Sequence, residues 1–459
     1  MWTDVRGLEL SAAGEAAARH YDETIEAYLG FRRDTGERLK RTFAADPEMP
    51  MAHCLRGYFM QLFAHAPLHR RARESAAKAE AAAAGATARE RAHVAALRAW
   101  VADDVAGATQ IWEDILVEHP LDVLALKLAH YTHFYCGESG EMRNSVARVL
   151  PAWSEAVPGY GYVLGVKAFS LEEAGDYAAA EAAGRRAVEL NPRDSWATHA
   201  VAHVMEMQGR TREGIAWLDG LSANWEGIHN FVNHLWWHLG LFHLEREDYD
   251  AVLKLFDERF GAPDSEEYLD ICNATSMLWR LQARGVPVGA RWQELAAKSE
   301  SRIVDRLLAF ADAHYMLAFA ATGRWEAAER LREAAATASA AEGAHGWAMR
   351  ECGAEILQAI TAYARGDFTA VVEHLWPIRG RVRCLGGSHA QRDLFQQMLI
   401  LAALKGGRLK LATALLAERA AGNPASAWSW KRTAEVREHL GDAAGAMAAR
   451  EKAAALLAA

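Results

Sequence analysis

The chain has 459 residues, of which 51% are hydrophobic, and its formal net charge is −9. This hydrophobic content excludes a disordered chain, and the length allows one large core or several domains. The acidic balance argues against a general nucleic-acid binder, because such proteins need a basic face to neutralise phosphate groups.

Cysteine usage and the N-terminal stretch indicate a soluble protein of a reducing compartment. The five cysteines are scattered and none forms a CxxC pair, so we expect neither a disulfide framework nor a cysteine-zinc site. The stretch MWTDVRGLEL lacks the pattern of a signal peptide, and no run of about 18 apolar residues is present to span a membrane. We therefore expect a cytoplasmic protein with no membrane and no nucleic-acid partner.

From its start, the chain has the pattern of a series of helical hairpins. Alanine is abundant, proline is scarce at 11 residues, and β-branched runs are absent, which favours an all-α fold. Gly30 and Pro47 mark a degenerate first unit, and residues 105–120 fit a second one. The best-defined unit covers residues 161–192, in which a Gly-Asp-Tyr turn joins two helices and Asn-Pro ends the second helix.

The same pattern of small residues and turn glycines recurs through the rest of the chain. Turn glycines follow at Gly209, Gly323, Gly366, Gly407 and Gly441. Glu247 stands where the unit around Tyr249 would have its glycine. A period of about 34 residues is that of tetratricopeptide repeats. We expect about ten to twelve hairpins, stacked as a right-handed α-solenoid with a concave inner face, in a single domain over residues 1–459.

Residues 376–389, WPIRGRVRCLGGSH, form the least regular segment of the chain. The segment is expected to be either a joint between two sub-arrays or a long loop that crosses the concave face. Loops of such length inside a compact domain are uncommon and often functional.

Histidines concentrate on the helices that should line the concave face. In the repeat frame the inward positions hold His130, His133, Glu172, His199, His203, Glu206, His234 and His238. His199/His203 and His234/His238 are each spaced by four residues, so both imidazoles of a pair lie on one face of a helix. Because neighbouring helices pack roughly 10 Å apart, the two pairs are expected to converge.

Convergent histidines suit several chemistries. His199, His203, His234 and His238, with Glu206 nearby, would suit a divalent transition metal such as zinc, manganese or iron. A metal with an open coordination position could activate water, as in a hydrolase. Without a metal, the histidines could act as general acids or bases, or bind an anion or carboxylate. Packing alone is the remaining interpretation.

Other residues complete the predicted site. Of Trp236 and Trp237, one is expected in the repeat interface and the other toward the groove, and we include Trp237 among the ligand contacts. Arg392 and Asp393 follow a helix start that Ser388 could cap, and they are expected to face the groove from the opposite wall. The patterns GxGxxG, GxSxG and HExxH and the P-loop are absent, so nucleotide-binding, lipase and zincin readings lack support.

Four segments of the chain resemble the tetratricopeptide repeat protein 38 family. They are HFYCGESGEMRNSVARVLPAW, ATHAVAHVMEMQGR, NHLWWHLGLFHLEREDYDAVLKLFD and GGSHAQRDLF. The resemblance covers nearly the whole chain and implies an α-helical repeat fold and a soluble cytoplasmic protein, but no particular reaction or ligand. Where members of the family have Asp-Ala-Gln-Arg-Asp, this chain has His389 as the first residue, which departs from the family pattern.

The leading hypothesis is a solenoid whose concave pocket, around residues 130–245, binds a small molecule or a short peptide through its histidines. A metal-dependent hydrolase and a scaffold that grips a partner protein are the alternatives. The inner positions are rich in histidine and aromatic residues and poor in lysine, which disfavours a clamp for a peptide carboxylate. A homo-oligomer is an open alternative to a monomer.

Overall fold

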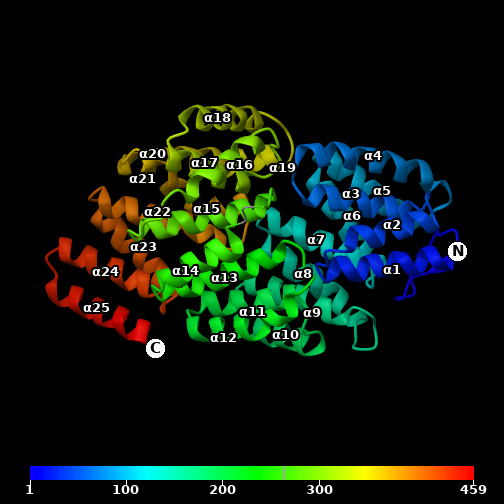
Figure 1. Cartoon of the computed structure of the whole chain (residues 1–459), viewed down its shortest axis with the longest axis horizontal. Coiled ribbons are helices and arrows are strands. Elements are labelled where there is room, and N and C mark those ends of the chain that lie inside the picture. Colours follow the sequence, from blue (N-terminus) through cyan, green and yellow to red (C-terminus); the bar gives the residue numbers. More distant parts are fainter. Residues whose placement is uncertain (262–263, 459) are drawn as a thin grey trace.

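Antiparallel helical hairpins make up the protein in the computed structural model, which describes residues 1–261 and 264–458 (Figure 1). The helices of the first half are α1 (Glu15–Leu29), α2 (Thr35–Ala45), α3 (Pro50–Leu62), α4 (Ala66–Ala82), α5 (Ala88–Val101), α6 (Val105–Glu118), α7 (Val123–Tyr135), α8 (Ser139–Val149), α9 (Tyr160–Glu173), α10 (Tyr177–Leu190), α11 (Ser195–Met207), α12 (Thr211–Leu221) and α13 (Phe231–Glu245). The helices of the second half are α14 (Tyr249–Leu255), α15 (Tyr268–Ala283), α16 (Arg291–Arg302), α17 (Ala309–Thr322), α18 (Trp325–Ser339), α19 (Ala344–Ala348), α20 (Ala354–Ala364), α21 (Phe368–Ile378), α22 (His389–Lys405), α23 (Leu409–Gly422), α24 (Ala427–His439) and α25 (Ala443–Ala458).

Short elements connect or extend these helices. The 3-10 turns are η1 (Ala83–Gly85), η2 (Leu150–Ala152), η3 (Ser222–Trp225) and η6 (Arg379–Leu385), and the π-helical turns are η4 (Phe256–Phe260) and η5 (Met349–Gly353). Strands β1 (Trp2–Thr3) and β2 (Glu9–Leu10) pair antiparallel next to α1.

Sequential pairing of the helices confirms the predicted all-α, tetratricopeptide-repeat-like solenoid. Most helices contact the next one along the chain, with η4 between α14 and α15 and η5 between α19 and α20, which gives twelve hairpins within the described residues and α19 as an extra helix between α18 and α20. Aspartates begin several of these helices. Asp176 and Asp194, for example, accept hydrogen bonds from the backbone N–H groups of Ala179 and Ala197, which would otherwise lack partners.

The turns inside the hairpins require a left-handed backbone conformation. Gly175 supplies it between α9 and α10 with a φ of 85°, as the repeat pattern predicts. Glu247 adopts the same conformation between α13 and α14, with a φ of 60°, although it carries a side chain. The fold therefore keeps the shape of the turn where the sequence has lost the glycine.

Hairpins that are far apart in the sequence contact one another. α22 packs against α11 and α15, so it occupies the space that an open solenoid would leave as a groove. Arg302, at the end of α16, donates to the carbonyl of Ala64 between α3 and α4, at 2.9 Å. At the other end of the chain, Arg212 donates to the carbonyl of Ala458 in α25, at 2.6 Å. Repeats far apart in sequence are thus in contact.

The inner helices form the centre of the molecule. Nearly every residue of α7, α11, α15 and α17 is buried, so these helices are covered by protein on all sides. Across the described residues, no helix combines the length and the apolar content that crossing a bilayer would require. All five cysteines are free thiols.

The segment 376–389 is mostly helical. α21 ends at Ile378, η6 covers Arg379–Leu385, and α22 begins at His389. Ser388 caps α22, since its hydroxyl accepts from the backbone N–H of Gln391, at 3.3 Å. The segment brings the chain from the rim of the solenoid into its centre.

Candidate metal centre and adjoining cavity

Two pairs of histidines, one on α11 and one on α13, meet in the core of the protein. The Nε2 atom of His199 lies 2.9 Å from that of His203 and 3.0 Å from that of His234. The Nε2 atom of His238 lies 3.2 Å from that of His234. One ligand atom from each of the four side chains fits within 4.8 Å of the others. The convergence expected from the spacing of the two pairs is therefore present.

The Nδ1 atoms of three of these histidines face acceptor groups on other helices, whereas Nδ1 of His199 has no hydrogen-bond partner among the described residues. Nδ1 of His238 lies 2.9 Å from Oε2 of Glu206, and Nδ1 of His234 lies 3.1 Å from Oδ1 of Asn273 on α15. Nδ1 of His203 is 3.7 Å from a carboxylate oxygen of Glu172 on α9. In His234 and His238 these hydrogen bonds place the proton on Nδ1 and leave the Nε2 lone pair directed at the shared centre.

Burial keeps the four imidazoles neutral. Their residues are at most 4% exposed, and Phe169, Trp196, Phe231 and Trp237 pack around them. The pKa values of His199 and His203 are well below the ordinary value. Burial is the largest cause, and repulsion from the neighbouring imidazoles is the next. Burial also lowers the pKa of His238 to about 3. Neutral imidazole is the form that binds a metal ion.

The spacing of the four Nε2 atoms fits a transition metal. Zinc binds imidazole nitrogen at about 2.0–2.1 Å, so tetrahedral ligand nitrogens lie roughly 3.3 Å apart. The measured Nε2–Nε2 distances of 2.9–3.2 Å are close to that value. Burial raises the pKa of Glu206 to about 8. A divalent cation at the centre would favour the ionised carboxylate, which is the better acceptor for His238.

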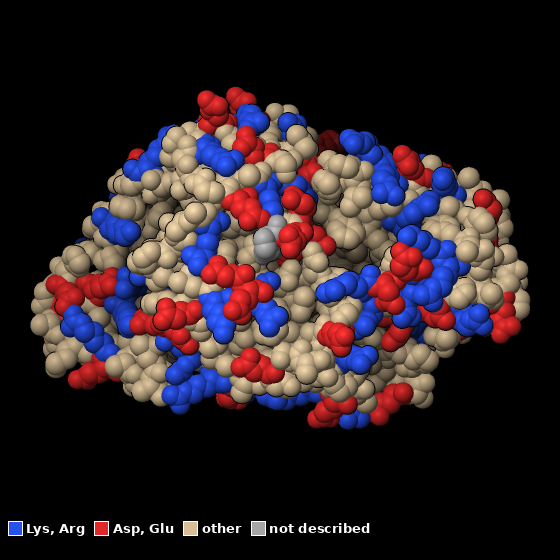
Figure 2. Space-filling view, viewed as in Figure 1, with Lys and Arg blue, Asp and Glu red and all other residues tan. Residues whose placement is uncertain are grey.

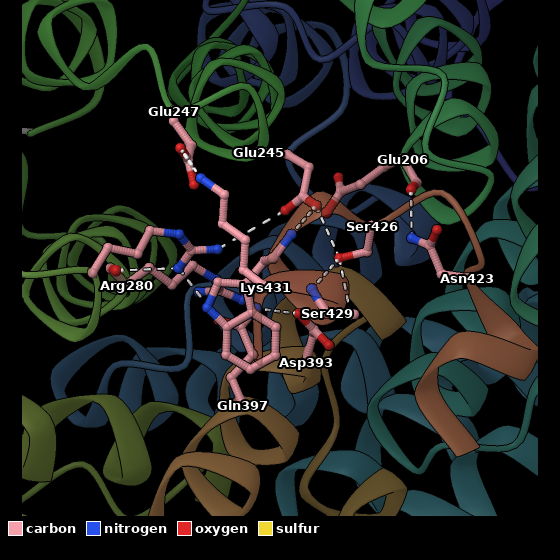
Figure 3. Close-up of polar contacts among 12 residues, drawn as sticks. Glu206, Glu245, Glu247, Arg280, Asp393, Gln397, Asn423, Ser426, Ser429 and Lys431 are labelled. Atoms are coloured by element: carbon pink, nitrogen blue, oxygen red, sulfur yellow. Dashed lines mark hydrogen bonds and ion pairs between the residues drawn. The ribbon is translucent and has the colours of Figure 1, made fainter. Parts of the chain in front are cut away.

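A cavity of about 800 Å³ lies next to this cluster. Its wall comes from the C-terminal ends of α11 and α13, from α15, and from η6, α22 and α23. Figure 3 shows Glu245, Asp393 and Ser426, from three separate parts of the chain, close together in this wall. Glu245 accepts from the Ser426 hydroxyl at 2.8 Å, and Asp393 binds the guanidinium of Arg419.

The cavity is placed differently from the expected pocket around residues 130–245. Glu206, Arg392 and Asp393 line it, as predicted, but none of the four clustered histidines does. Because α22 fills the middle of the concave side, the histidines lie behind the wall, and Glu206, which bonds His238, links them to the cavity.

Three other predicted site residues lie apart from the cavity. His130 is buried, with Nδ1 3.2 Å from the hydroxyl of Ser170. His133 is held between Glu113 and Glu138. Trp237 is fully buried, stacks on His234, and donates from its indole N–H to the hydroxyl of Ser276 on α15, at 3.1 Å. Trp237 therefore packs against the histidine cluster.

Glu172 lies beside the cluster, and both of its carboxylate oxygens are buried without a hydrogen-bond partner among the described residues. Burial, and then the charges of Glu173 and Glu206, raise the pKa of Glu172 well above its ordinary value. Its neighbour Glu173 accepts instead from the backbone N–H of His389 and from Arg392, at 3.0 and 3.3 Å. These bonds attach the start of α22 to α9.

Two functional residues of α15 escaped the sequence analysis. Asn273 orients His234, and Arg280 lines the cavity. The signal that could have found them is the polar content of residues 268–283, because a helix buried on all sides seldom carries Asn, Ser and Arg without a partner for each.

No family model matches the chain. Among solved structures, the chain is similar to a human IFIT1 dimer with PPP-AAAA, at 13% identity and a TM-score of 0.42, covering 98% of this chain and 97% of that chain. The APC/C hetero-tetramer Cut9–Hcn1 matches at 10% identity and a TM-score of 0.36, covering 96% and 93%. The TPR domain of P58(IPK) matches at 12% identity and a TM-score of 0.23, covering 80% and 92%. Since each of these TM-scores lies below 0.5, the tetratricopeptide-repeat-like solenoid is assigned from the hairpins of this chain itself.

Proposed function

We propose that this helical-repeat protein holds one divalent transition metal ion at His199, His203, His234 and His238, and binds a small molecule or short peptide in the adjoining cavity. The observation that carries the proposal is the meeting of four Nε2 atoms, in two of which, those of His234 and His238, an Nδ1 hydrogen bond turns the lone pair inward. Imidazole ligands favour zinc or iron over manganese. The quoted resemblance supports membership of the tetratricopeptide repeat protein 38 family, and the free thiols support a cytoplasmic location.

The metal ion's proposed role is to fasten α11 to α13. Each helix supplies two ligands, and the ends of both helices form a wall of the cavity. A hydrolase would need a coordination position open to substrate, whereas four protein nitrogens complete a tetrahedral set and aromatic rings surround the centre. The helical-repeat fold supports a binding or scaffold role, and the neighbouring cavity favours ligand binding over catalysis at the metal.

Elemental analysis of the purified protein tests this proposal. We expect about one zinc or iron ion per chain, and a lower melting temperature after chelation, because a ligand bound only by the folded state stabilises it by mass action. The variants His199→Asn and His238→Asn should lose the metal. His314→Asn is the matched control, since His314 is also buried on an inner helix but bonds the carbonyl of Phe310 instead.

A second readout covers the case in which the histidine variants fail to fold. Cobalt(II) added to the metal-free wild-type protein should give the visible absorption of a four-nitrogen tetrahedral site. Absence of stoichiometric metal, together with no thermal shift on adding zinc, manganese or iron, would contradict the proposal.

A further inference from the structure

The wall of the cavity carries a charge opposite to that of the protein as a whole. The chain has a formal net charge of −9, and Figure 2 shows acidic and basic side chains interspersed over the face in view. In the cavity wall, by contrast, seven arginines accompany four carboxyl groups, and no lysine is present. This leaves a formal excess of three positive charges around the cavity.

Three of the four carboxyl groups of the wall, all except Glu418, are already engaged. Asp393 binds Arg419 and also accepts from Gln397 at 2.6 Å. Glu245 accepts from Ser426, and Glu206 faces His238. These groups therefore hold their own partners and cannot neutralise the remaining guanidinium groups at close range.

Arg280 is a buried arginine of the cavity wall that forms no ion pair with a carboxylate among the described residues. It is 1% exposed, and it donates only to the backbone carbonyls of Ser276 and Ala390, at 3.3 and 2.8 Å. Among the described residues no carboxylate lies within ion-pair distance of it. Burial lowers the pKa of Arg280 to about 10, and the charges of Asp393 and Glu206, which lie beyond ion-pair distance, offset this shift only in part.

Two more arginines of the wall have no carboxylate partner within the part of the chain that the structure describes. Arg379 and Arg383 lie on η6, are exposed, and donate to the carbonyls of Trp376 and Gly137, each at 3.2 Å. The third arginine of η6, Arg381, is paired with Glu351 at 3.4 Å. The cavity thus has one unneutralised guanidinium inside the protein and two at its surface.

From this arrangement we infer that the cavity binds a small molecule carrying two or more phosphate or carboxylate groups, with Arg280 as its innermost contact and Arg379 and Arg383 at the entrance. Guanidinium groups match phosphate and carboxylate oxygens in a bidentate geometry. A volume of about 800 Å³ lies in the usual range for small-molecule sites. The inference rests on the ligand-binding role proposed for the cavity.

Isothermal titration of the full chain with pyrophosphate and with citrate tests the inference and separates the phosphate from the carboxylate class. We expect saturable one-to-one binding of at least one of them, weakened by added salt. Arg280→Gln should reduce the affinity at least tenfold. Arg379→Ala combined with Arg383→Ala should reduce it severalfold, and this exposed pair keeps the test valid if Arg280→Gln does not fold. Arg186→Ala, an exposed arginine on α10, is the control and should leave the affinity unchanged.

Three results would overturn the inference. They are the absence of saturable binding of both anions, an affinity that Arg280→Gln and the double variant leave unchanged, and tighter binding of a single-stranded oligonucleotide than of either small anion. Metal content is measured on the same samples. Stoichiometric metal without anion binding would contradict this inference but support the metal centre. Anion binding without metal would support this inference but contradict the metal centre.

Discussion

His133 shows how a histidine on an inner helix serves stability. Its Nε2 atom lies 3.1 Å from Oε1 of Glu113 on α6, and its Nδ1 atom lies 2.8 Å from Oε2 of Glu138. Burial disfavours the charged imidazole, but the hydrogen bonds to the two carboxylates outweigh burial and raise the pKa of His133 to about 9. Both ring nitrogens then donate, and the imidazolium joins α6 to the start of α8.

This geometry predicts a loss of stability on the alkaline side. The pKa of His133 in the folded state is above its unfolded value of about 6.5, so the stabilisation is complete below pH 6.5 and disappears as the pH rises through about 9. We expect the difference in unfolding free energy between wild type and His133→Asn to shrink by about 3 kcal/mol between pH 6 and pH 9.5, at 1.36 kcal/mol per pKa unit. Urea unfolding at a series of pH values measures it.

His314→Asn is the control for this experiment. Burial lowers the pKa of His314 to about 4, so its side chain stays neutral throughout this pH range. Its effect on stability should therefore change by less than about 1 kcal/mol from pH 6 to pH 9.5, and in the opposite direction, because only the unfolded imidazole, with a pKa of about 6.5, titrates in this range. A difference for His133→Asn that does not shrink as the pH rises would show that the two ion pairs do not form in solution.

At the scale of the element, the turn between α13 and α14 carries strain that the hairpins with a turn glycine avoid. A residue with a side chain at a φ of 60° costs about 1–2 kcal/mol relative to the right-handed region, and glycine does not bear this cost. Glu247 partly offsets this cost through an ion pair with Lys431, which links the turn to α24.

Replacing Glu247 separates the two effects. Glu247→Ala and Glu247→Gly both remove the ion pair, but only the glycine relieves the backbone, so Glu247→Gly should be more stable than Glu247→Ala by about 1 kcal/mol. Gly175→Ala, at a turn with a φ of 85° and open space around its Cα, should lose a similar amount. Equal stability of the two Glu247 variants in chemical denaturation would rule out strain at this turn.

Hairpins and histidine pairs could be predicted from sequence because both depend on local spacing. The period of the turn glycines gave the solenoid, and the four-residue spacing within His199/His203 and His234/His238 gave the shared faces of α11 and α13. The cavity could not be predicted, because its wall joins Arg280, Arg419 and η6, which are far apart in the chain. Their approach depends on the curvature summed over many repeats, which no single repeat reveals.

At the scale of the whole molecule, contacts between distant repeats should make unfolding cooperative. In an open solenoid each repeat touches only its neighbours, so the ends can unfold independently. Here Arg302 donates to the carbonyl of Ala64, and Asp305 accepts from the backbone N–H of Ala66 at 2.7 Å. The second hairpin is thereby attached to the end of α16.

Arg302→Met tests this attachment. Removing one partner of a buried ion pair costs about 3–5 kcal/mol, and Arg302 is 3% exposed beside Asp305. Hydrogen exchange should show that residues 62–66 and 303–306 lose protection together, while α9 to α13 keep theirs. Arg330→Met, at an exposed ion pair with Glu300, should change little. Loss of protection confined to residues 303–306 would contradict the attachment.

The contact of α25 with α12 has a consequence for how this architecture can change. Ordinary repeat arrays lengthen or shorten by duplication or deletion of a unit, since each new unit needs only a neighbour. In this protein Arg212 and Arg246 donate hydrogen bonds to the carbonyls of Ala458 and Leu457. One hairpin more or fewer between α12 and α25 would move α25 by roughly the 10 Å width of a helix. This contact therefore constrains the number of hairpins between α12 and α25, whereas the side chains and loops of these hairpins can vary.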